Sequence, residues 1–121
     1  MIQLNHTIVR SKDALEASRY LAAVLGLPEP VAVGPFQAIP LANNLQLDYL
    51  TVDDEKITQQ HLAFQIDDED FEGILERVSA KQSYWADPYA TRENEVNDMN
   101  GGRGFYFQDP SGHWLEVLTR P

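Results

Sequence analysis

Three residues whose side chains bind divalent metals lie in short apolar segments of the sequence. His6, His61 and Glu116 each belong to a run typical of a β-strand, and the two intervals between them are both 55 residues long. Two imidazoles and one carboxylate held on rigid strands could bind a divalent metal and leave coordination positions open for a substrate. These residue types and their spacing predict a metalloenzyme.

The composition restricts what that metal site can be made of. The chain has 121 residues, of which 43% are hydrophobic and 23% charged, as expected for one folded domain with a real core. It has no cysteine, so neither a disulfide framework nor a thiolate metal site is possible. Any metal must therefore be held by nitrogen and oxygen ligands.

The charge and the apolar pattern exclude several functions. Nine basic and nineteen acidic residues give a formal net charge of −10, and no basic patch is present, so nucleic-acid binding is not expected. No apolar run approaches the roughly 18 residues that a membrane span needs. The N-terminal residues lack the basic and apolar parts of a signal peptide. We expect a cytoplasmic protein that does not enter a membrane and whose partner is a small molecule.

The same order of elements occurs twice along the chain. A strand over residues 3–9 is followed by a helix over 13–25, in which Asp13 caps the start and Gly26 suits the end. The second copy has a strand from His61 and a helix over about 69–80, with Asp68 at the position that corresponds to Asp13. Further strands are predicted over the segments 31–33, 36–41 and 45–52 in the first copy, and 83–86, 104–107 and 114–118 in the second. The pattern predicts an α+β fold of two βαβββ modules, about 1–54 and 58–121, within a single domain.

These features together carry a family resemblance. They are the strand that contains His6, the strand that contains His61, and the segment 104–116, in which an Asp-Pro-Ser-Gly turn precedes the strand of Glu116. In this order they resemble the vicinal oxygen chelate superfamily, also described as glyoxalase/bleomycin-resistance/dioxygenase proteins. The resemblance covers essentially the whole chain.

The resemblance implies a fold and a range of activities. The paired βαβββ modules would have curved mixed sheets that form a metal-binding cleft, and the protein would be a homodimer. His6, His61 and Glu116 would bind a divalent metal, either Ni, Zn, Mn or Fe. A substrate with two nearby oxygens would chelate this metal, and the chemistry expected first is that of a glyoxalase-like lyase or isomerase.

Two further residues are candidates for the site. Aligning the last strands of the two modules places Asp48 opposite Glu116, where glyoxalase-like members carry a fourth ligand. Gln46 lies on the same face of that strand and is an alternative. Tyr106 aligns with a tyrosine that contacts substrate in fosfomycin-resistance members, so we assign it a catalytic role together with Glu116. An ordinary sheet tyrosine and an exposed strand-end aspartate are the alternative interpretations.

The remaining chemistry-bearing residues carry weaker predictions. His113 follows the turn glycine and is expected to be a strand-start residue, although it could reach the rim of the cleft. Arg92 and Arg103 bracket a polar segment, 87–102, that is predicted to be a mobile loop, and they could meet an anionic group. The aromatic residues that could line an apolar cleft are Tyr84, Trp85 and Trp114.

Rival functions stay open from the sequence alone. A non-catalytic drug- or metabolite-binding protein of the bleomycin-resistance type would suit the acidic charge, but would not need three metal-ligand residues. A dioxygenase or a thiol transferase of the same family would use the same ligands. A metal-free descendant, in which the histidines only pack, is the third rival.

Overall fold

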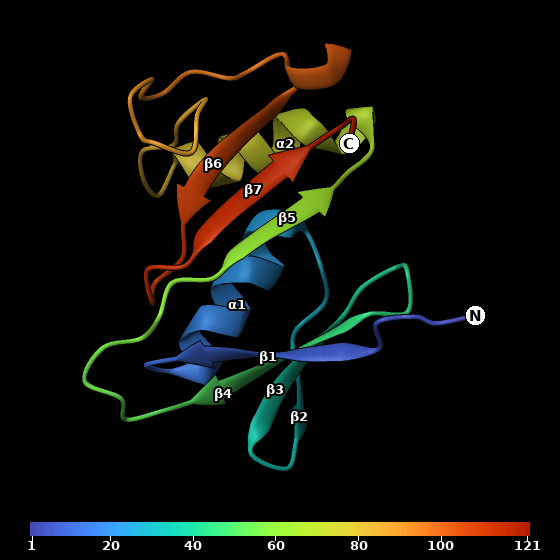
Figure 1. Ribbon diagram of the computed structural model, residues 1–121, viewed down its shortest axis with the longest axis vertical. Coiled ribbons are helices and arrows are strands. Elements are labelled where there is room, and N and C mark those ends of the chain that lie inside the picture. Colours follow the sequence, from blue (N-terminus) through green and yellow to red (C-terminus); the bar gives the residue numbers. More distant parts are fainter. The chain divides into compact units, whose positions relative to one another are not determined.

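The computed structural model describes all 121 residues and divides the chain into two compact units, residues 1–58 and 59–121. The first unit contains β1 (His6–Ser11), α1 (Ala14–Leu25), β2 (Val31–Val33), β3 (Phe36–Pro40) and β4 (Gln46–Thr51). The second contains β5 (His61–Gln65), α2 (Asp68–Ser79), a short 3-10 helix (Met99–Gly101), β6 (Gly104–Gln108) and β7 (Trp114–Leu118). The predicted α+β fold of two βαβββ modules is confirmed (Figure 1).

The two sheets share one topology. In the first unit the strand order is β1-β4-β3-β2, and in the second it is β5-β7-β6. The first strand of each unit pairs in parallel with the last, and the other pairings are antiparallel. The parallel pairing brings the first and last strands of each module together at one edge of its own sheet. Residues far apart in the sequence therefore become neighbours there.

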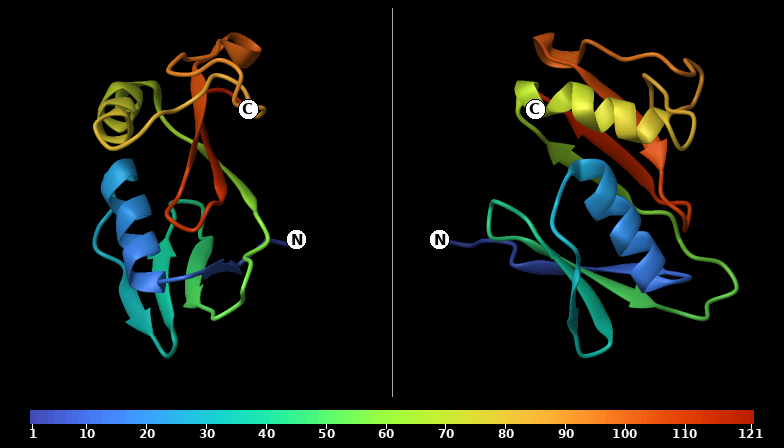
Figure 2. Two further views of the ribbon diagram at one scale, coloured as in Figure 1. Left: turned by 90° about the vertical axis from the view of Figure 1, so that its left-hand side faces the viewer. Right: turned by 180° about the vertical axis from the view of Figure 1, so that it is seen from behind.

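In each unit a helix covers one face of the sheet (Figure 2). Leu21 and Val24 of α1 are fully buried, as are Val9 and Tyr49 of the sheet beneath them. In the second unit Phe71 of α2 packs edge-on against Phe105, with ring centroids 5.7 Å apart. Burial of each such side chain contributes about 1.5–3 kcal/mol to folding. Because successive side chains of a strand point to opposite faces, every second side chain projects from the face that the helix does not cover, where polar and metal-binding side chains can lie. Neither helix is long and apolar enough to cross a membrane.

The helix boundaries confirm one predicted cap and correct the other. Asp13 caps α1 by accepting a hydrogen bond from the Glu16 amide, and Gly26 ends the helix in the left-handed conformation, with φ of 72°. In α2 the capping position belongs to Asp67, whose side chain makes no capping bond, and Asp68 lies in the first turn. Its acidic first turn instead interacts favourably with the helix dipole.

The segment between α2 and β6 differs from the prediction. The strand expected over 83–86 is reduced to Trp85, which exchanges two backbone hydrogen bonds of 2.7 and 2.8 Å with Tyr106. The loop that follows has a hydrogen-bonded framework that the sequence did not predict. Asp87 accepts bonds from the amide and hydroxyl of Thr91, and the buried side chain of Asn97 donates to the Ala86 carbonyl at 2.8 Å.

Candidate metal centre

His61 and Glu116 lie together on the sheet of the second unit. In the parallel pairing of β5 with β7, His61 is level with Trp114 and Ala63 with Glu116, so both side chains project from the face opposite α2. The Nε2 atom of His61 lies 3.1 Å from Oε1 of Glu116. The imidazole is about half exposed, whereas the carboxylate is only 13% exposed. Two metal-ligand atoms from different strands thus converge at a point that solvent can reach.

Tyr106 lies beside this pair. It is the direct cross-strand partner of Glu116 in the β6–β7 pairing, and its phenol is hydrogen-bonded to the Glu116 carboxylate. Its ring centroid is 5.9 Å from that of His61. Burial, together with the charge of Glu116 and this hydrogen bond, raises the pKa of Tyr106 to about 12. The phenol is therefore a neutral donor to the carboxylate at ordinary pH.

Two tryptophans extend the same face of the sheet. The ring of Trp114 stacks on Tyr106, with centroids 6.0 Å apart, and lies 5.4 Å from the ring of Trp85. The buried Nε1 of Trp114 has no acceptor for its hydrogen bond. Tyr84, expected to line the same cleft, instead contacts Phe105, on the side of the sheet that α2 covers. The surroundings of His61 and Glu116 are thus aromatic and of low polarity.

The first unit holds the other predicted ligands on its own sheet. His6 begins β1 opposite Gln46 of β4, and Ile8 is level with Asp48. The ring atom Nδ1 of His6 lies 2.8 Å from the Oδ1 of Asn5. When Nδ1 carries the proton and donates to Asn5, the lone pair of Nε2 is available to a metal.

Asp48 and Gln46 are bonded to each other. The side-chain amide of Gln46 donates to Oδ1 of Asp48 at 2.8 Å, and Asp48 is 8% exposed. The pairings also put Asp48 at the position in β4 that Glu116 occupies in β7. Asp48 is level with Ile8, two residues after His6, and Glu116 is level with Ala63, two residues after His61. The sequence alignment of these two residues therefore agrees with the strand register.

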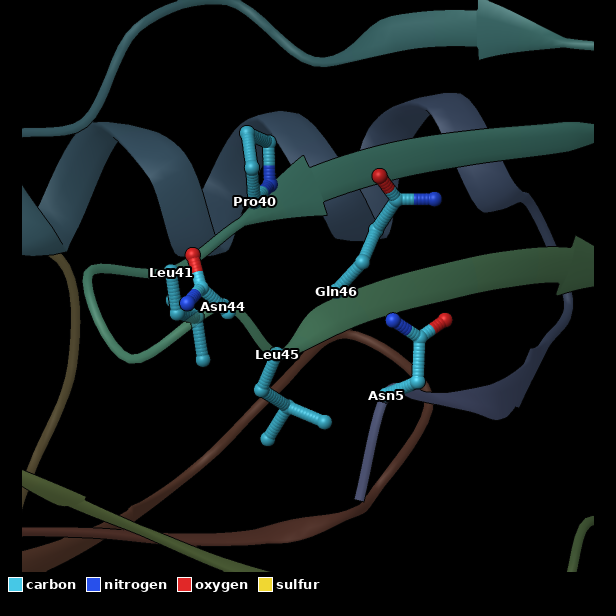
Figure 3. Close-up of a pocket in the computed structure, with 6 residues that line it drawn as sticks. All are labelled: Asn5, Pro40, Leu41, Asn44, Leu45 and Gln46. Carbon is cyan, nitrogen blue, oxygen red and sulfur yellow. The ribbon is translucent and has the colours of Figure 1, made fainter. Parts of the chain in front are cut away.

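A hollow of about 460 Å³ adjoins the start of β1 and β4 (Figure 3). Its lining includes the side-chain amides of Asn5, Asn44 and Gln46, together with Pro40 and two leucines. No charged residue lines it. The two amides that contact His6 and Asp48 thus also face this hollow.

The comparisons with known proteins decide the family. The family model described as "Glyoxalase/Bleomycin resistance protein/Dioxygenase superfamily" matches residues 3–117. The chain belongs to this superfamily. The resemblance stated from the sequence is confirmed, and members of the superfamily include metal-dependent enzymes that act on small molecules.

The names of several relatives bear on the chemistry of the superfamily. The structure of oxidase ChaP-H1 is 41% identical, with a TM-score of 0.97, over 100% of this chain and 98% of that one. Oxidase ChaP-H2 is 48% identical, with a TM-score of 0.94, over 99% and 94% of the two chains. The metallothiol transferase FosB of Shouchella clausii (strain KSM-K16) is 33% identical over 102 residues, 83% of this chain but only 64% of the transferase.

The donor set of this superfamily member fits a divalent metal. An imidazole nitrogen and a carboxylate oxygen 3.1 Å apart are both ligands that Fe, Mn, Ni and Zn accept. Neither unit by itself gathers three or more histidine, aspartate or glutamate side chains in a metal-binding group. His61 and Glu116 therefore need a further ligand. His6 is the one that the sequence predicts, and its role stays a prediction.

Other candidates of the sequence are engaged elsewhere. Arg103 pairs with Glu72, and its guanidinium lies 4.1 Å from the centre of the Phe71 ring, on the α2 side of the sheet. Arg92 pairs with Glu95 at 3.4 Å. His113 is fully buried and does not reach a rim. Sequence reasoning did not single out Asn5, although an amide directly before a candidate ligand was visible in the sequence.

Proposed function

We propose that this protein is an oxidase that depends on a divalent metal and uses dioxygen to oxidise a small molecule with two adjacent oxygen atoms. The observation that carries the proposal is the convergence of His61 and Glu116 beside Tyr106. The identity of 41% and 48% to two chains named oxidases, over nearly their whole length, supports oxidation over the other chemistries of the superfamily.

The protein would contribute ligands and a defined environment. His61 and Glu116 bind the metal, and His6 is the further ligand of the proposal. The bound metal would polarise the oxygens of the substrate and assist electron transfer to dioxygen. Tyr106 keeps its proton and holds the Glu116 carboxylate through a charge-assisted hydrogen bond. Trp85 and Trp114 provide the low-polarity surroundings in which such electrostatic interactions are strong.

The position of Asp48 bears on the choice between oxidase and lyase. The prediction of a glyoxalase-like lyase or isomerase depended on the small size of the chain and on Asp48 as a fourth ligand. One of its oxygens already accepts a hydrogen bond from Gln46, and its side chain is nearly buried. An oxidase with two histidines and one carboxylate needs no such fourth ligand. We therefore rank the lyase below the oxidase.

The second candidate function is a metallothiol transferase, favoured by the 33% identity to FosB. Both candidates use a metal, so metal binding does not separate them, but their co-substrates do. The oxidase consumes dioxygen, whereas the transferase consumes a thiol. A non-catalytic binding protein would consume neither.

We also propose a homodimer, which light scattering of the purified protein tests.

The experiment begins with metal content. Metal analysis and Mn(II) binding should be measured for the parent, for His61→Ala and for Glu116→Gln. The matched control is Glu76→Gln, which makes the same change of charge on the exposed face of α2. We expect both site variants to lose the metal and the control to keep it.

The reaction is tested on the same proteins. Oxygen uptake is followed with catechol as a probe that carries two adjacent oxygens, and thiol consumption with fosfomycin and cysteine. Uptake of oxygen by the parent and the control alone supports the oxidase. Thiol consumption without oxygen uptake would replace it with the transferase. Equal metal binding by the parent and both site variants would refute the proposed centre.

A further inference from the structure

His113 is buried at the base of the strand that contains Glu116, although the metal centre does not use it. It follows Gly112, which has φ of 88°, and directly precedes β7. Its exposed fraction is 0%, and it belongs to the largest fully buried side chains of the protein. A buried imidazole needs a specific partner for its ring nitrogens, because an unsatisfied buried polar group is costly.

One partner of the ring is the backbone of Gln60, the residue before His61. The Gln60 amide donates to Nδ1 of His113 at 2.9 Å. The Gln60 carbonyl in turn accepts a bond of 2.9 Å from the amide of Trp114. Both backbone polar groups of Gln60 are thus held by residues at the start of β7. Because Nδ1 acts as an acceptor, the neutral ring carries its proton on Nε2.

The ring, and not the backbone carbonyl of His113, accepts the Gln60 amide. The carbonyl of His113 already accepts the Asp109 amide at 3.1 Å, which closes the turn before β7. The Asp109 carboxylate fixes this turn by accepting the amides of Ser111 and His113, at 2.9 and 2.8 Å. The imidazole therefore supplies the acceptor that lets β5 begin beside β7 one residue before His61.

We propose that His113 is a positioning residue for the metal centre, which acts by fixing the start of β5 and hence the place of His61 relative to Glu116. The 3.1 Å separation of their ligand atoms depends on how β5 lies against β7. Metal–ligand distances tolerate deviations of only about 0.2 Å, so small movements of this strand end weaken binding. The effect on the metal rests on the proposed function, whereas the effect on the backbone of β5 does not.

Two substitutions of His113 separate the hydrogen bond from simple packing. In His113→Asn the side-chain oxygen can occupy the place of Nδ1, because it is the same number of bonds from the backbone. In His113→Leu a methyl group stands there and accepts nothing. Gln60→Pro removes the same hydrogen bond from the donor side and leaves the imidazole in place. It serves as the second test if the leucine variant does not fold.

Two measurements apply to each variant. Amide hydrogen exchange at Leu62, and at Gln60 where it keeps an amide, reports on the start of β5, because the register directs the amides of the even-numbered residues of β5 towards β7. The affinity for Mn(II) reports on the metal centre, and it is obtained from the concentration of free Mn(II) measured by electron paramagnetic resonance. His113→Leu and Gln60→Pro should speed the exchange and weaken Mn(II) binding by about tenfold or more. His113→Asn should restore slow exchange and most of the affinity. The control Val78→Ala, on the buried face of α2, should lower thermal stability and leave Mn(II) affinity unchanged.

The outcomes distinguish this inference from the proposed function. Parental exchange and affinity in folded His113→Leu, or in Gln60→Pro, would overturn the positioning role. Equal losses in the asparagine and leucine variants would also overturn it, because the acceptor would then be irrelevant. If the parent binds no Mn(II) or other divalent ion, the proposed function fails. The exchange at Gln60 and Leu62 then still decides whether His113 fixes the start of β5.

Discussion

The raised pKa of Tyr106 gives a quantitative prediction about stability in alkali. The folded protein holds the phenolic proton more tightly than the unfolded chain, since the pKa is about 12 instead of 10.0. The resulting stabilisation is complete below pH 10 and is lost as the pH rises from 10 towards 12. Linkage gives a loss of about 1 kcal/mol by pH 11 and of about 3 kcal/mol in full.

The substitution Tyr106→Phe isolates this contribution. Urea unfolding of chelator-treated protein should be measured between about pH 8 and 11 for the parent and the variant. All other side chains are the same in both proteins, so the difference between the two curves reports on Tyr106. We expect the parent to lose about 1 kcal/mol more than the variant. Parallel curves would show that neither burial nor Glu116 holds the proton on Tyr106, and would remove its proposed role as a neutral donor.

Three other predictions concern separate parts of the protein. Asn5→Ala should weaken Mn(II) binding about tenfold by releasing the His6 ring, whereas Asn44→Ala, in the same hollow, should not, as titration calorimetry can show. Ile74→Ala should cost about 2–5 kcal/mol in urea unfolding, because this side chain is 1% exposed, and a smaller loss would contradict the core assigned to α2. Desolvation raises the pKa of Asp87, but hydrogen bonds from its loop outweigh it and lower the pKa. The loop should therefore loosen as the pH falls below about 4, and Asp87→Ala should loosen it at neutral pH, as amide exchange measures.

The sequence predicted the architecture well because strong local signals mark it. The cap at Asp13 and the stop at Gly26 delimit α1 in the structure as they do in the sequence. The strand predicted over 83–86 was wrong because its apolar pattern reflects aromatic side chains packed on both faces of the sheet. Only Trp85 of that segment pairs with β6. Tertiary packing of the aromatic side chains thus produced an apolar sequence pattern like that of a strand, although the segment forms no continuous row of backbone hydrogen bonds with β6.

The site was predictable to the extent that it depends on strand register. Parallel pairing and a period of two suffice to bring His61 next to Glu116. The bond between Tyr106 and Glu116 was not predictable, since it depends on the twist and the rotamers of neighbouring strands. The burial of His113 was equally hidden. The sequence shows only a histidine after a turn glycine. Nothing in it distinguishes an ordinary strand-start residue from a histidine whose ring bonds a backbone amide far away in the sequence.

The two sheets show how one topology can carry different chemistry. Asp48 and Glu116 occupy equivalent positions, but their cross-strand neighbours differ: Ala38 lies beside Asp48, and Tyr106 beside Glu116. Asp48 is consequently bonded to the amide of Gln46 along its own strand, whereas Glu116 is held by a phenol and lies within reach of an imidazole. A carboxylate with a fixed orientation and a second ligand 3.1 Å away is better prepared to bind a metal than one paired with an amide. We therefore expect that loss of the Glu116 carboxylate, in the second unit, abolishes metal binding. The substitution Asp48→Asn, in the first unit, should leave most of the metal binding intact.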